Sequence, residues 1–384
     1  MIYADANATY PIDPSHYDKV AQLLKEADGN PSSIHAKGRD AKVALERARA
    51  NVARMLGAKG PEITFTSGAT EANNMALQGL VGLRGREMRL PHVIVSAVEH
   101  RSILEVAKVL EDRGLCDLDV APVLPNGTVD LERLVELINA DTALVSVMGA
   151  NNEVGALNPV QELARRVKEK APEAHVHIDA VQLLGKTDLT WLAASTVDSA
   201  SFSAHKIGAY KGIGALYLKP GKKLALLSAG GGQERGRRPG TENMPGIVSF
   251  GLKCEELHGQ ELAHAACMRR LRDAFIEALK RVPGAGLHGG LTAAETLPNT
   301  VNFHVEGVPG EDILLNFDLS GIAASSGSAC SSGVSRPSHV LMAMGLGEWV
   351  ALNSVRVSFT AEGLDEDVVR MESVLGETLA RVKS

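Results

Sequence analysis

The chain has 384 residues, of which 45% are hydrophobic and 22% charged, and its formal net charge is −6. This length exceeds one typical domain, so we expect a soluble chain with a large and a small domain. The acidic balance and the lack of a long basic run give no electrostatic reason to expect a nucleic-acid or anionic-membrane partner. No apolar stretch approaches a membrane span and no signal-peptide pattern begins the chain, so we expect a cytoplasmic protein.

Short apolar or β-branched runs alternate with helical patterns in the first half of the chain. This alternation predicts an α/β fold with a mostly parallel sheet flanked by helices. Three further strands follow so closely that the sheet should become mixed there. The strand and helix pairs are 62–66 with 71–82, 92–98 with 101–113 and 143–148 with 160–170, and the further strands are 175–179, 199–203 and 214–218.

A long helical pattern over about 245–281 and a Pro/Gly-rich break at 282–290 end this alternation, which is typical of a domain boundary. We expect a large domain over 15–255 and a smaller α+β domain over 256–384, with residues 1–14 packing against the smaller one. The smaller domain is predicted to contain strands at 300–305, 322–325 and 354–359 and helices at 311–317, 338–344 and 364–382.

Two strands are predicted to end at residues with reactive side chains. Lys206 follows the strand at 199–203 amid small residues, which give a Schiff-base lysine the access it needs. Asp179 ends the strand at 175–179, where a carboxylate can pair with a pyridinium nitrogen. Taken alone, Lys206 is better explained as an exposed surface lysine, because most lysines are exposed; the surrounding segments favour the Schiff-base role.

A metal site is an alternative for the same strand. Side chains alternate along a strand, so His175, His177 and Asp179 share one face. Neither a fourth ligand nor an open coordination position is evident, however, and we expect no metal.

Two glycine-containing stretches suit an anion. Residues 66–71 (TSGATE) offer hydroxyls and backbone N–H groups at a strand-to-helix turn, where the helix dipole favours a phosphate. An ordinary capped helix explains them as well. The stretch 230–243 (GGGQERGRRPGTEN) is polar and basic enough to reach an anion, or it is a plain surface loop.

Four scattered cysteines without CxxC spacing argue against a disulfide framework and against a structural zinc site. We expect reduced thiols. Cys330 lies amid small and hydroxyl residues (ASSGSACSSG) and is the candidate nucleophile, whereas Cys254 and Cys267 are expected to be structural cysteines on a helix. The fourth is Cys116.

Taken together, these segments resemble the cysteine desulfurases of the NifS/IscS type, in the class V aminotransferase group with the fold type I pyridoxal-phosphate (PLP) architecture. The resemblance covers nearly the whole chain. It is carried by the ordered motifs NPSSIH, TSGATEANN, VEH, NNEVG, HIDAVQ, SAHK, GGGQERG, GTEN and SSGSAC and by the late SVR.

The resemblance implies that L-cysteine is the substrate, Lys206 holds PLP and Cys330 takes the sulfur. It also implies a homodimer, and delivery of the sulfur to an acceptor or scaffold protein for iron-sulfur cluster or other thio-cofactor assembly. The further implied roles are Asp179 at the pyridine nitrogen, Gln182 at the phenolic oxygen, His100 on the ring and as proton shuttle, Ala69, Thr70, Ser203 and His205 at the phosphate, Thr241 at the phosphate of the neighbouring subunit, and Arg356 with Asn152 at the substrate carboxylate.

Three segments depart from the family pattern, at 5–11, 207–210 and 360–363, and they leave substrate gating open. Another PLP enzyme of this fold, an aminotransferase or a selenocysteine lyase, is the nearest alternative. Cys330 argues against an aminotransferase. It does not distinguish a cysteine desulfurase from a selenocysteine lyase. A catalytically silent scaffold would be favoured only if Lys206 or Cys330 were missing, and both are present.

Overall fold

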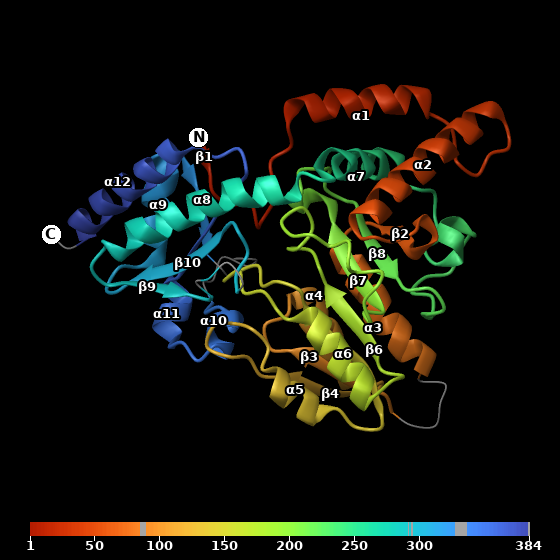
Figure 1. Ribbon diagram of the computed structural model, residues 1–384, viewed down its shortest axis with the longest axis horizontal. Coiled ribbons are helices and arrows are strands. Elements are labelled where there is room, and N and C mark those ends of the chain that lie inside the picture. The colour runs from red at the N-terminus through yellow and green to blue at the C-terminus, as the bar shows by residue number, and fades with distance from the viewer. Residues whose placement is uncertain (85–89, 291, 293–294, 327–335, 383–384) are drawn as a thin grey trace.

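The computed structural model describes residues 1–84, 90–290, 292, 295–326 and 336–382. Two lobes are apparent in Figure 1, and both ends of the chain lie in the lobe that contains β9 and β10. The candidate nucleophile Cys330 lies outside the described residues.

The larger lobe is built on a seven-stranded sheet with the strand order β2-β8-β7-β6-β5-β3-β4. β3, β4, β5, β6 and β7 run parallel, and only β8 is antiparallel to its neighbours β7 and β2. The predicted α/β class and the change to a mixed sheet are therefore confirmed. The strands are β2 (Ile63–Thr66), β3 (His92–Ser96), β4 (Asp117–Ala121), β5 (Thr142–Met148), β6 (His175–Asp179), β7 (Ser199–Ser203) and β8 (Gly214–Leu218).

Helices cover both faces of this sheet, because its strands alternate apolar side chains to the two sides. Val93 and Val95 of β3 pack in a cluster with α3 and α4, whereas Ile94 between them belongs to the cluster that includes α2, α6 and α7. Burial on both faces explains why these strands contain almost no exposed residue. The helices of this lobe are α1 (Pro14–Glu26), α2 (Ala36–Met55), α3 (Ala69–Arg84), α4 (Arg101–Asp112), α5 (Leu131–Leu137), α6 (Val160–Lys170) and α7 (Met244–Leu257).

The smaller lobe contains an antiparallel sheet with the strand order β12-β13-β10-β9. Phe275 of α8 packs edge-on against Phe303 of β10, with 5.8 Å between the ring centroids, in a core shared with α9 and α12. Its elements are α8 (Glu261–Lys280), β9 (Ala285–His288), β10 (Thr300–Val305), α9 (Gly310–Leu319), β11 (Ile322–Ala323), β12 (Ser325–Ser326), α10 (His339–Ala343), α11 (Glu348–Asn353), β13 (Val355–Ser358) and α12 (Asp365–Val382).

The two lobes are connected through the N-terminal segment and through the junction between α7 and α8. The strand β1 (Ile2–Tyr3) pairs with β11, and Ala4 belongs to the core of the smaller lobe. In Figure 1, α8 extends from the end of α7 into the smaller lobe. The domain limits of the sequence analysis stay a prediction.

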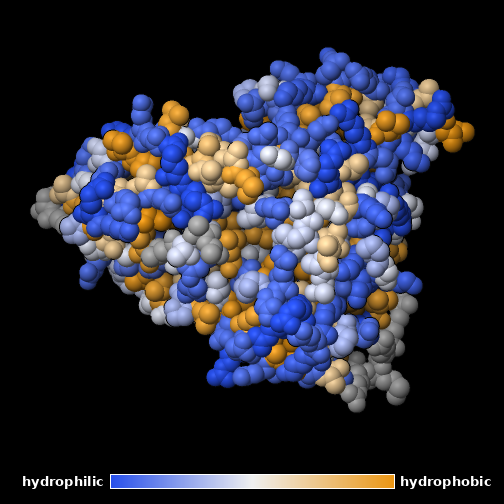
Figure 2. All heavy atoms as spheres, in the orientation of Figure 1, coloured by the Kyte–Doolittle hydropathy of each residue, from blue (hydrophilic) through white to orange (hydrophobic). Residues whose placement is uncertain are grey.

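Two expectations about these elements were wrong. The single helix expected over about 245–281 is two helices, α7 and α8, because Gly259 between them has a left-handed φ of 81°. The single strand expected at 322–325 is two short strands in different sheets, β11 and β12. Among the described residues, no helix is both long and apolar enough to span a bilayer, and the face in Figure 2 is mostly hydrophilic, with small groups of hydrophobic side chains.

Candidate active site

A cavity of about 750 Å³ opens where the parallel strands end at their carboxyl edge and meet the smaller lobe. Such an edge is where open α/β sheets bind ligands, because the loops that follow several strands converge there. One predicted site residue, Thr241, is exposed and is not in its wall, and another, Cys330, lies outside the described residues. The predicted residues that do line it are Ala69, Thr70, His100, Asn152, Asp179, Gln182, Ser203, His205, Lys206 and Arg356.

Lys206 lies in a short 3-10 turn directly after β7. Its Nζ donates hydrogen bonds to the carbonyl oxygens of Asn7 (2.7 Å) and Ala8 (2.8 Å), so the N-terminal segment holds the amine in place. Burial and, to a smaller extent, the charge of nearby Arg356 lower the pKa of Lys206 to about 8, although Asp5 and Asp179 oppose the shift. A larger share of this amine is therefore neutral near physiological pH than for an exposed lysine, as a nucleophilic lysine requires.

Asp179 ends β6 as a buried carboxylate. Its Oδ2 accepts a hydrogen bond from Asn73 Nδ2 at 2.9 Å, and its Oδ1 accepts one from the Val181 N–H at 3.2 Å. Asn73 projects from α3 and also contacts His177 and Ser102. The sequence analysis assigned no role to Asn73, although it lies within the TSGATEANN motif, because a contact across 106 residues leaves no local signal.

The three residues weighed as a metal site do not form one. His175 Nε2 and His177 Nδ1 each lie 2.8 Å from Ser199 Oγ, and His177 Nε2 lies 3.1 Å from Asn73 Oδ1. Burial lowers the pKa of His175 to about 4 and that of His177 to about 3. These histidines are neutral members of a hydrogen-bond chain that ends at Asp179. Within the described ranges, no three His, Cys, Asp or Glu side chains are grouped to bind a metal.

His100 is the N-cap of α4, and its Nδ1 accepts a hydrogen bond from the Ser102 N–H at 3.1 Å. Burial lowers the pKa of His100 and the charge of Asp179 opposes this. The neighbouring Glu99 is enclosed, and its Oε1 accepts hydrogen bonds from Ser96 Oγ (2.8 Å) and the Met148 N–H (2.5 Å). Burial raises the pKa of Glu99 to about 8, so this carboxyl is mostly protonated at pH 7.

The N-terminus of α3 forms one end of the cavity, together with Ser203 and His205. Gly214 of β8 lies directly against Gly68 beside this end: a Cβ on Gly214 would approach the Gly68 backbone to 2.7 Å. His205 Nδ1 lies 3.1 Å from Thr9 Oγ1, and burial lowers the pKa of His205 to about 4. His205 therefore offers no positive charge near neutral pH. The backbone N–H groups and hydroxyls at this end are the groups that suit a phosphate.

The second glycine-rich stretch, 230–243, is anchored through Glu234, whose side chain is 3% exposed. Glu234 accepts two hydrogen bonds from Arg49 of α2, at 2.7 and 2.8 Å, and Glu234 itself has a left-handed φ of 47°. A buried ion pair thus fixes the stretch to α2 at Glu234, so it is not a plain surface loop. Thr241, further along it, is exposed.

Arg356 projects from β13 of the smaller lobe into the cavity and is 5% exposed. Its Nη2 donates to Asp5 Oδ1 and to Ser325 Oγ, both at 2.7 Å, and its Nη1 donates to the Asn152 carbonyl oxygen at 3.1 Å. Its Nε has no hydrogen-bond partner in the described part of the chain. A buried guanidinium with a free N–H is suited to a ligand carboxylate.

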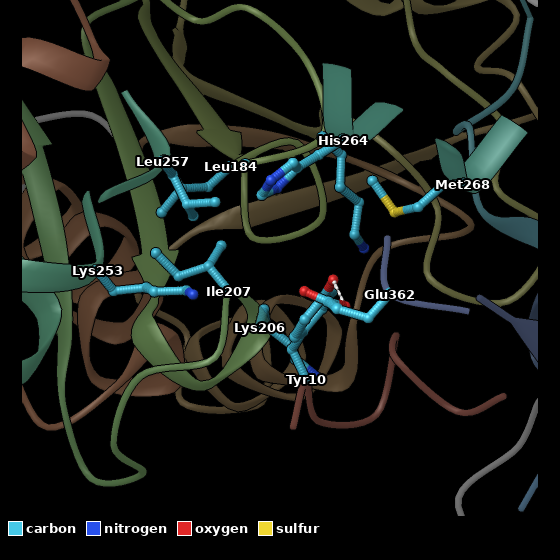
Figure 3. A pocket seen from close by; sticks show the side chains of 11 residues that line it. Tyr10, Leu184, Lys206, Ile207, Lys253, Leu257, His264, Met268 and Glu362 are labelled. Atoms are coloured by element: carbon cyan, nitrogen blue, oxygen red, sulfur yellow. Dashed lines mark hydrogen bonds between the residues drawn. The ribbon is translucent and has the colours of Figure 1, made fainter. Parts of the chain in front are cut away.

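A second, water-sized cavity of about 20 Å³ lies behind Lys206, and Figure 3 shows the side chains around it. Here the three segments that depart from the family pattern meet. Tyr10 donates a hydrogen bond to Glu362 Oε2 at 2.6 Å, drawn as a dashed line in Figure 3, and a Cβ on Gly208 would come within 2.9 Å of the Pro11 carbonyl oxygen. The departures therefore form one connected patch beside the lysine.

The cysteines within the described residues differ from expectation in one case. Cys116 and Cys254 are buried, and burial raises the pKa of both thiols, that of Cys116 to about 11. Cys267 on α8 is exposed, so the expectation that it is a buried structural cysteine was wrong. None of these three lines the large cavity.

Comparison with known proteins agrees with this site. The aminotransferase class-V family model matches residues 2–371. The cysteine desulfurase IscS 1 of Archaeoglobus fulgidus is 39% identical over all of this chain and 98% of its own. Two solved structures are similar: a NifS-like protein (36% identity, TM-score 0.91, 99% of each chain) and SspA in complex with cysteine (29% identity, TM-score 0.82, 95% of this chain and 100% of the other).

The family match spans nearly the whole chain, and the similar proteins are covered almost end to end. Enzymes of this family depend on PLP. The chain belongs to the cysteine desulfurases of the aminotransferase class-V family, as its motifs predicted.

Proposed function

We propose that this chain is a PLP-dependent cysteine desulfurase, which converts L-cysteine to L-alanine and takes the sulfur onto Cys330. The observation that carries the proposal is one cavity with a desolvated amine at Lys206, a buried carboxylate at Asp179 and an unpaired guanidinium N–H at Arg356. The similarity to a cysteine desulfurase and to a protein solved with cysteine supports the choice of substrate.

The residues present fit PLP. The N-terminus of α3, with Ala69 and Thr70, offers backbone N–H groups to the phosphate, and Ser203 and His205 complete that end. Asp179, held by two donors, lines the cavity and would serve as the hydrogen-bond acceptor that keeps a pyridine nitrogen protonated. We further propose that His100 lies across the ring and that Gln182 contacts the phenolic oxygen; both line the cavity.

Arg356 and Asn152 are proposed to bind the substrate carboxylate. The free Nε of Arg356 supplies one donor at once, and a second requires Nη2 to release Asp5 or Ser325. A guanidinium favours this two-point contact because its N–H groups lie in one plane. The contact would fix the orientation of the substrate before any bond is broken.

Lys206 is proposed to hold the cofactor and, once released by the substrate amine, to move the Cα proton. Bound PLP supplies an electron sink for the charge that remains when this proton leaves. A pKa of about 8 lets the amine both accept and return a proton near neutral pH. His100, with a pKa below its ordinary value, is neutral there and able to accept a proton in turn.

The sulfur step needs a thiolate. We propose that Cys330 Sγ attacks the substrate sulfur, so that an S–S bond forms while the Cβ–S bond breaks. The electron pair of the broken bond stays on carbon, which takes one proton to become the methyl group of alanine. The products are alanine and a persulfide on Cys330.

Three broader features are also proposed. A homodimer would bring Thr241, exposed and outside the cavity of its own chain, to the cavity of a partner. We expect an acceptor or scaffold protein to receive the sulfur for iron-sulfur cluster or other thio-cofactor assembly, and a cytoplasmic location. Light scattering on the purified protein measures the oligomeric state, and a monomer at micromolar concentration would contradict the dimer.

The reaction is tested by incubating the PLP-loaded protein with L-cysteine and a thiol reductant and measuring alanine and sulfide, which we expect in equal amounts. Cys330→Ser should keep bound PLP and its spectral response to L-cysteine, yet yield almost no alanine and no persulfide, because a hydroxyl cannot store sulfane sulfur. Cys267→Ser is the matched control and should behave as the wild type. Alanine production at the wild-type rate by Cys330→Ser, or a persulfide mapped to Cys267, would contradict the mechanism.

A further inference from the structure

Lys186 is a buried lysine that the proposed chemistry leaves without a role. It is 3% exposed and lies in the turn after β6, four residues beyond Gln182. It lines the small cavity behind Lys206 and is absent from the wall of the large one. Burial lowers the pKa of Lys186 well below its ordinary value, and the charges of Lys206 and Arg356 lower it further.

The amine of Lys186 has two hydrogen-bond partners. Its Nζ donates to Gln182 Oε1 at 2.5 Å and to Asn7 Oδ1 at 2.9 Å. No carboxylate forms an ion pair with it within the described residues. A buried lysine without a counter-charge is costly, so a contribution to folding alone is a poor explanation for it.

The two partners of Lys186 are themselves joined next to Lys206. Gln182 Nε2 donates to the Asn7 carbonyl oxygen at 3.1 Å, and Lys206 Nζ donates to the same oxygen at 2.7 Å. Asn7 is 1% exposed and is held further by Asn299, which donates to Asn7 Oδ1 at 3.0 Å. Lys186 thus contacts Asn7, whose carbonyl oxygen binds the Lys206 amine, and Gln182, which donates to the same oxygen.

These contacts decide which end of the Gln182 amide faces which neighbour. An amide oxygen accepts and an amide nitrogen donates, so Oε1 belongs toward the lysine amine and Nε2 toward the carbonyl. The second hydrogen on Nε2 is then left for the large cavity, which Gln182 lines. Without Lys186, Oε1 would be a buried acceptor lacking a partner, and the amide would be free to turn.

We propose that Lys186 is a positioning residue, whose amine fixes Gln182 and Asn7 so that Gln182 presents an N–H donor to the phenolic oxygen of PLP. This inference rests on the proposed function, since it takes PLP to be attached at Lys206. A donor at the phenolic oxygen draws electron density from it and weakens its hold on the proton at the Lys206 nitrogen. Lys186 therefore keeps that proton exchangeable near neutral pH without touching the cofactor.

The test is a titration of the visible absorbance of the PLP-loaded protein across neutral and alkaline pH, which reports that proton directly. Lys186→Met keeps the length of the side chain and removes the donor. We expect the titration midpoint to rise by about 0.4 to 1 pH unit, the equivalent of one ordinary hydrogen bond. Lys186→Leu is a second variant with the same expectation if the methionine variant does not fold.

Two comparisons separate positioning from other causes. In a Gln182→Leu background the midpoint should already be high, and adding Lys186→Met should raise it no further. Lys168→Met is the matched control, because Lys168 is another largely buried lysine, paired with Asp198 far from the cavity. It should lower thermal stability and leave the midpoint unchanged.

An unchanged midpoint in both Lys186 variants would overturn the proposal, and so would an equal rise in the Gln182→Leu background, which would mean that Lys186 acts on Lys206 by its charge alone. If the wild type formed no coloured complex with PLP, the proposed function would fail together with this inference. If the wild type titrates and the Lys186 variants titrate with the same midpoint, the proposed function stands and this inference falls.

Discussion

Two buried clusters of charge in this protein differ in whether their charges are balanced. Arg49 and Glu234 have 2% and 3% exposed side chains and form a two-bond ion pair. Arg49 also donates to the Ile63 carbonyl oxygen, and Glu234 accepts from the Phe65 N–H. In this first cluster, each charge has its counterpart and each polar atom has a partner.

The second cluster, around the large cavity, contains the amines of Lys206 and Lys186 and the guanidinium of Arg356. Within the described ranges, only Arg356 of these three has an ion-pair partner, Asp5, and its Nε is unpaired. The amines instead contact neutral carbonyl groups. Burial lowers the pKa of both lysines, so the second cluster combines amines of reduced charge with a guanidinium that keeps an unpaired N–H. Such an arrangement points to a ligand site, whereas the balanced pair points to stability.

The largest effect that this contrast predicts is the loss of activity in Lys206→Ala. Without the amine, alanine production should fall by at least about 10³-fold, because both cofactor attachment and proton transfer are lost. Mass spectrometry after borohydride reduction should find no PLP link in the variant. Lys253→Ala, which removes another lysine beside the small cavity, is the control and should keep the link. A reducible link in Lys206→Ala would remove Lys206 from its role.

The balanced pair should matter for folding and not for turnover. Arg49→Met leaves Glu234 buried and unpaired, which should lower the free energy of unfolding by about 3 to 5 kcal/mol in urea. Turnover per folded molecule should stay close to the wild-type value. Arg133→Ala removes an exposed pair with Glu136 and should cost at most about 1 kcal/mol. If Arg49→Met were as stable as Arg133→Ala, the buried Arg49–Glu234 pair would not have the stabilising role assigned to it.

Arg356→Gln should show the opposite pattern. We expect kcat/KM for L-cysteine to fall by about 10- to 100-fold, the value of one or two hydrogen bonds to a charged group. The free energy of unfolding should change less than in Arg49→Met, because Asp5 is 19% exposed and can be hydrated. Arg356→Lys should not restore the activity, since an ammonium lacks the planar pair of donors. A full rescue by lysine would mean that charge alone is recognised.

The smallest effect concerns Glu99, whose pKa is raised by burial from 4.5 to about 8. A carboxyl with a raised pKa in the folded state makes the protein lose stability as the pH rises from 4.5 to about 8, because the unfolded chain releases this proton while the folded chain still holds it. Glu99→Gln mimics the protonated form and should abolish this loss, which amounts to about 1.4 kcal/mol for each pH unit between the two pKa values. Unfolding curves on both sides of the window measure it. An equally steep pH dependence in the variant would show that Glu99 is not the responsible group.

Local patterns placed the main reactive residues. The strands at 175–179 and 199–203 coincide with β6 and β7, and the residues at their ends, Asp179 and Lys206, line one cavity as expected. The reason is that alternation of strand and helix implies parallel strands, and parallel strands end at one edge. The same patterns missed α1 and α2, and they merged α7 and α8 across a single glycine.

The residues that support the site escaped notice. Asn73, Lys186 and Asn7 carry ordinary side chains to which no motif assigned a role, and Glu234 lay in a stretch interpreted as free. Each of the four acquires its role through a partner that is 106 to 185 residues away in the sequence.

The amino-acid sequence by itself determined the family, the α/β class and the positions of the nucleophilic, acidic and carboxylate-binding candidates, because those depend on periodicity and on motifs that are short and local. Only the tertiary structure decided which buried charges are balanced and which await a ligand. Burial and pairing are properties of the assembled surroundings: Lys206 and Arg356 reach one cavity from different lobes, and Lys186 loses its water only when the N-terminal segment packs over it.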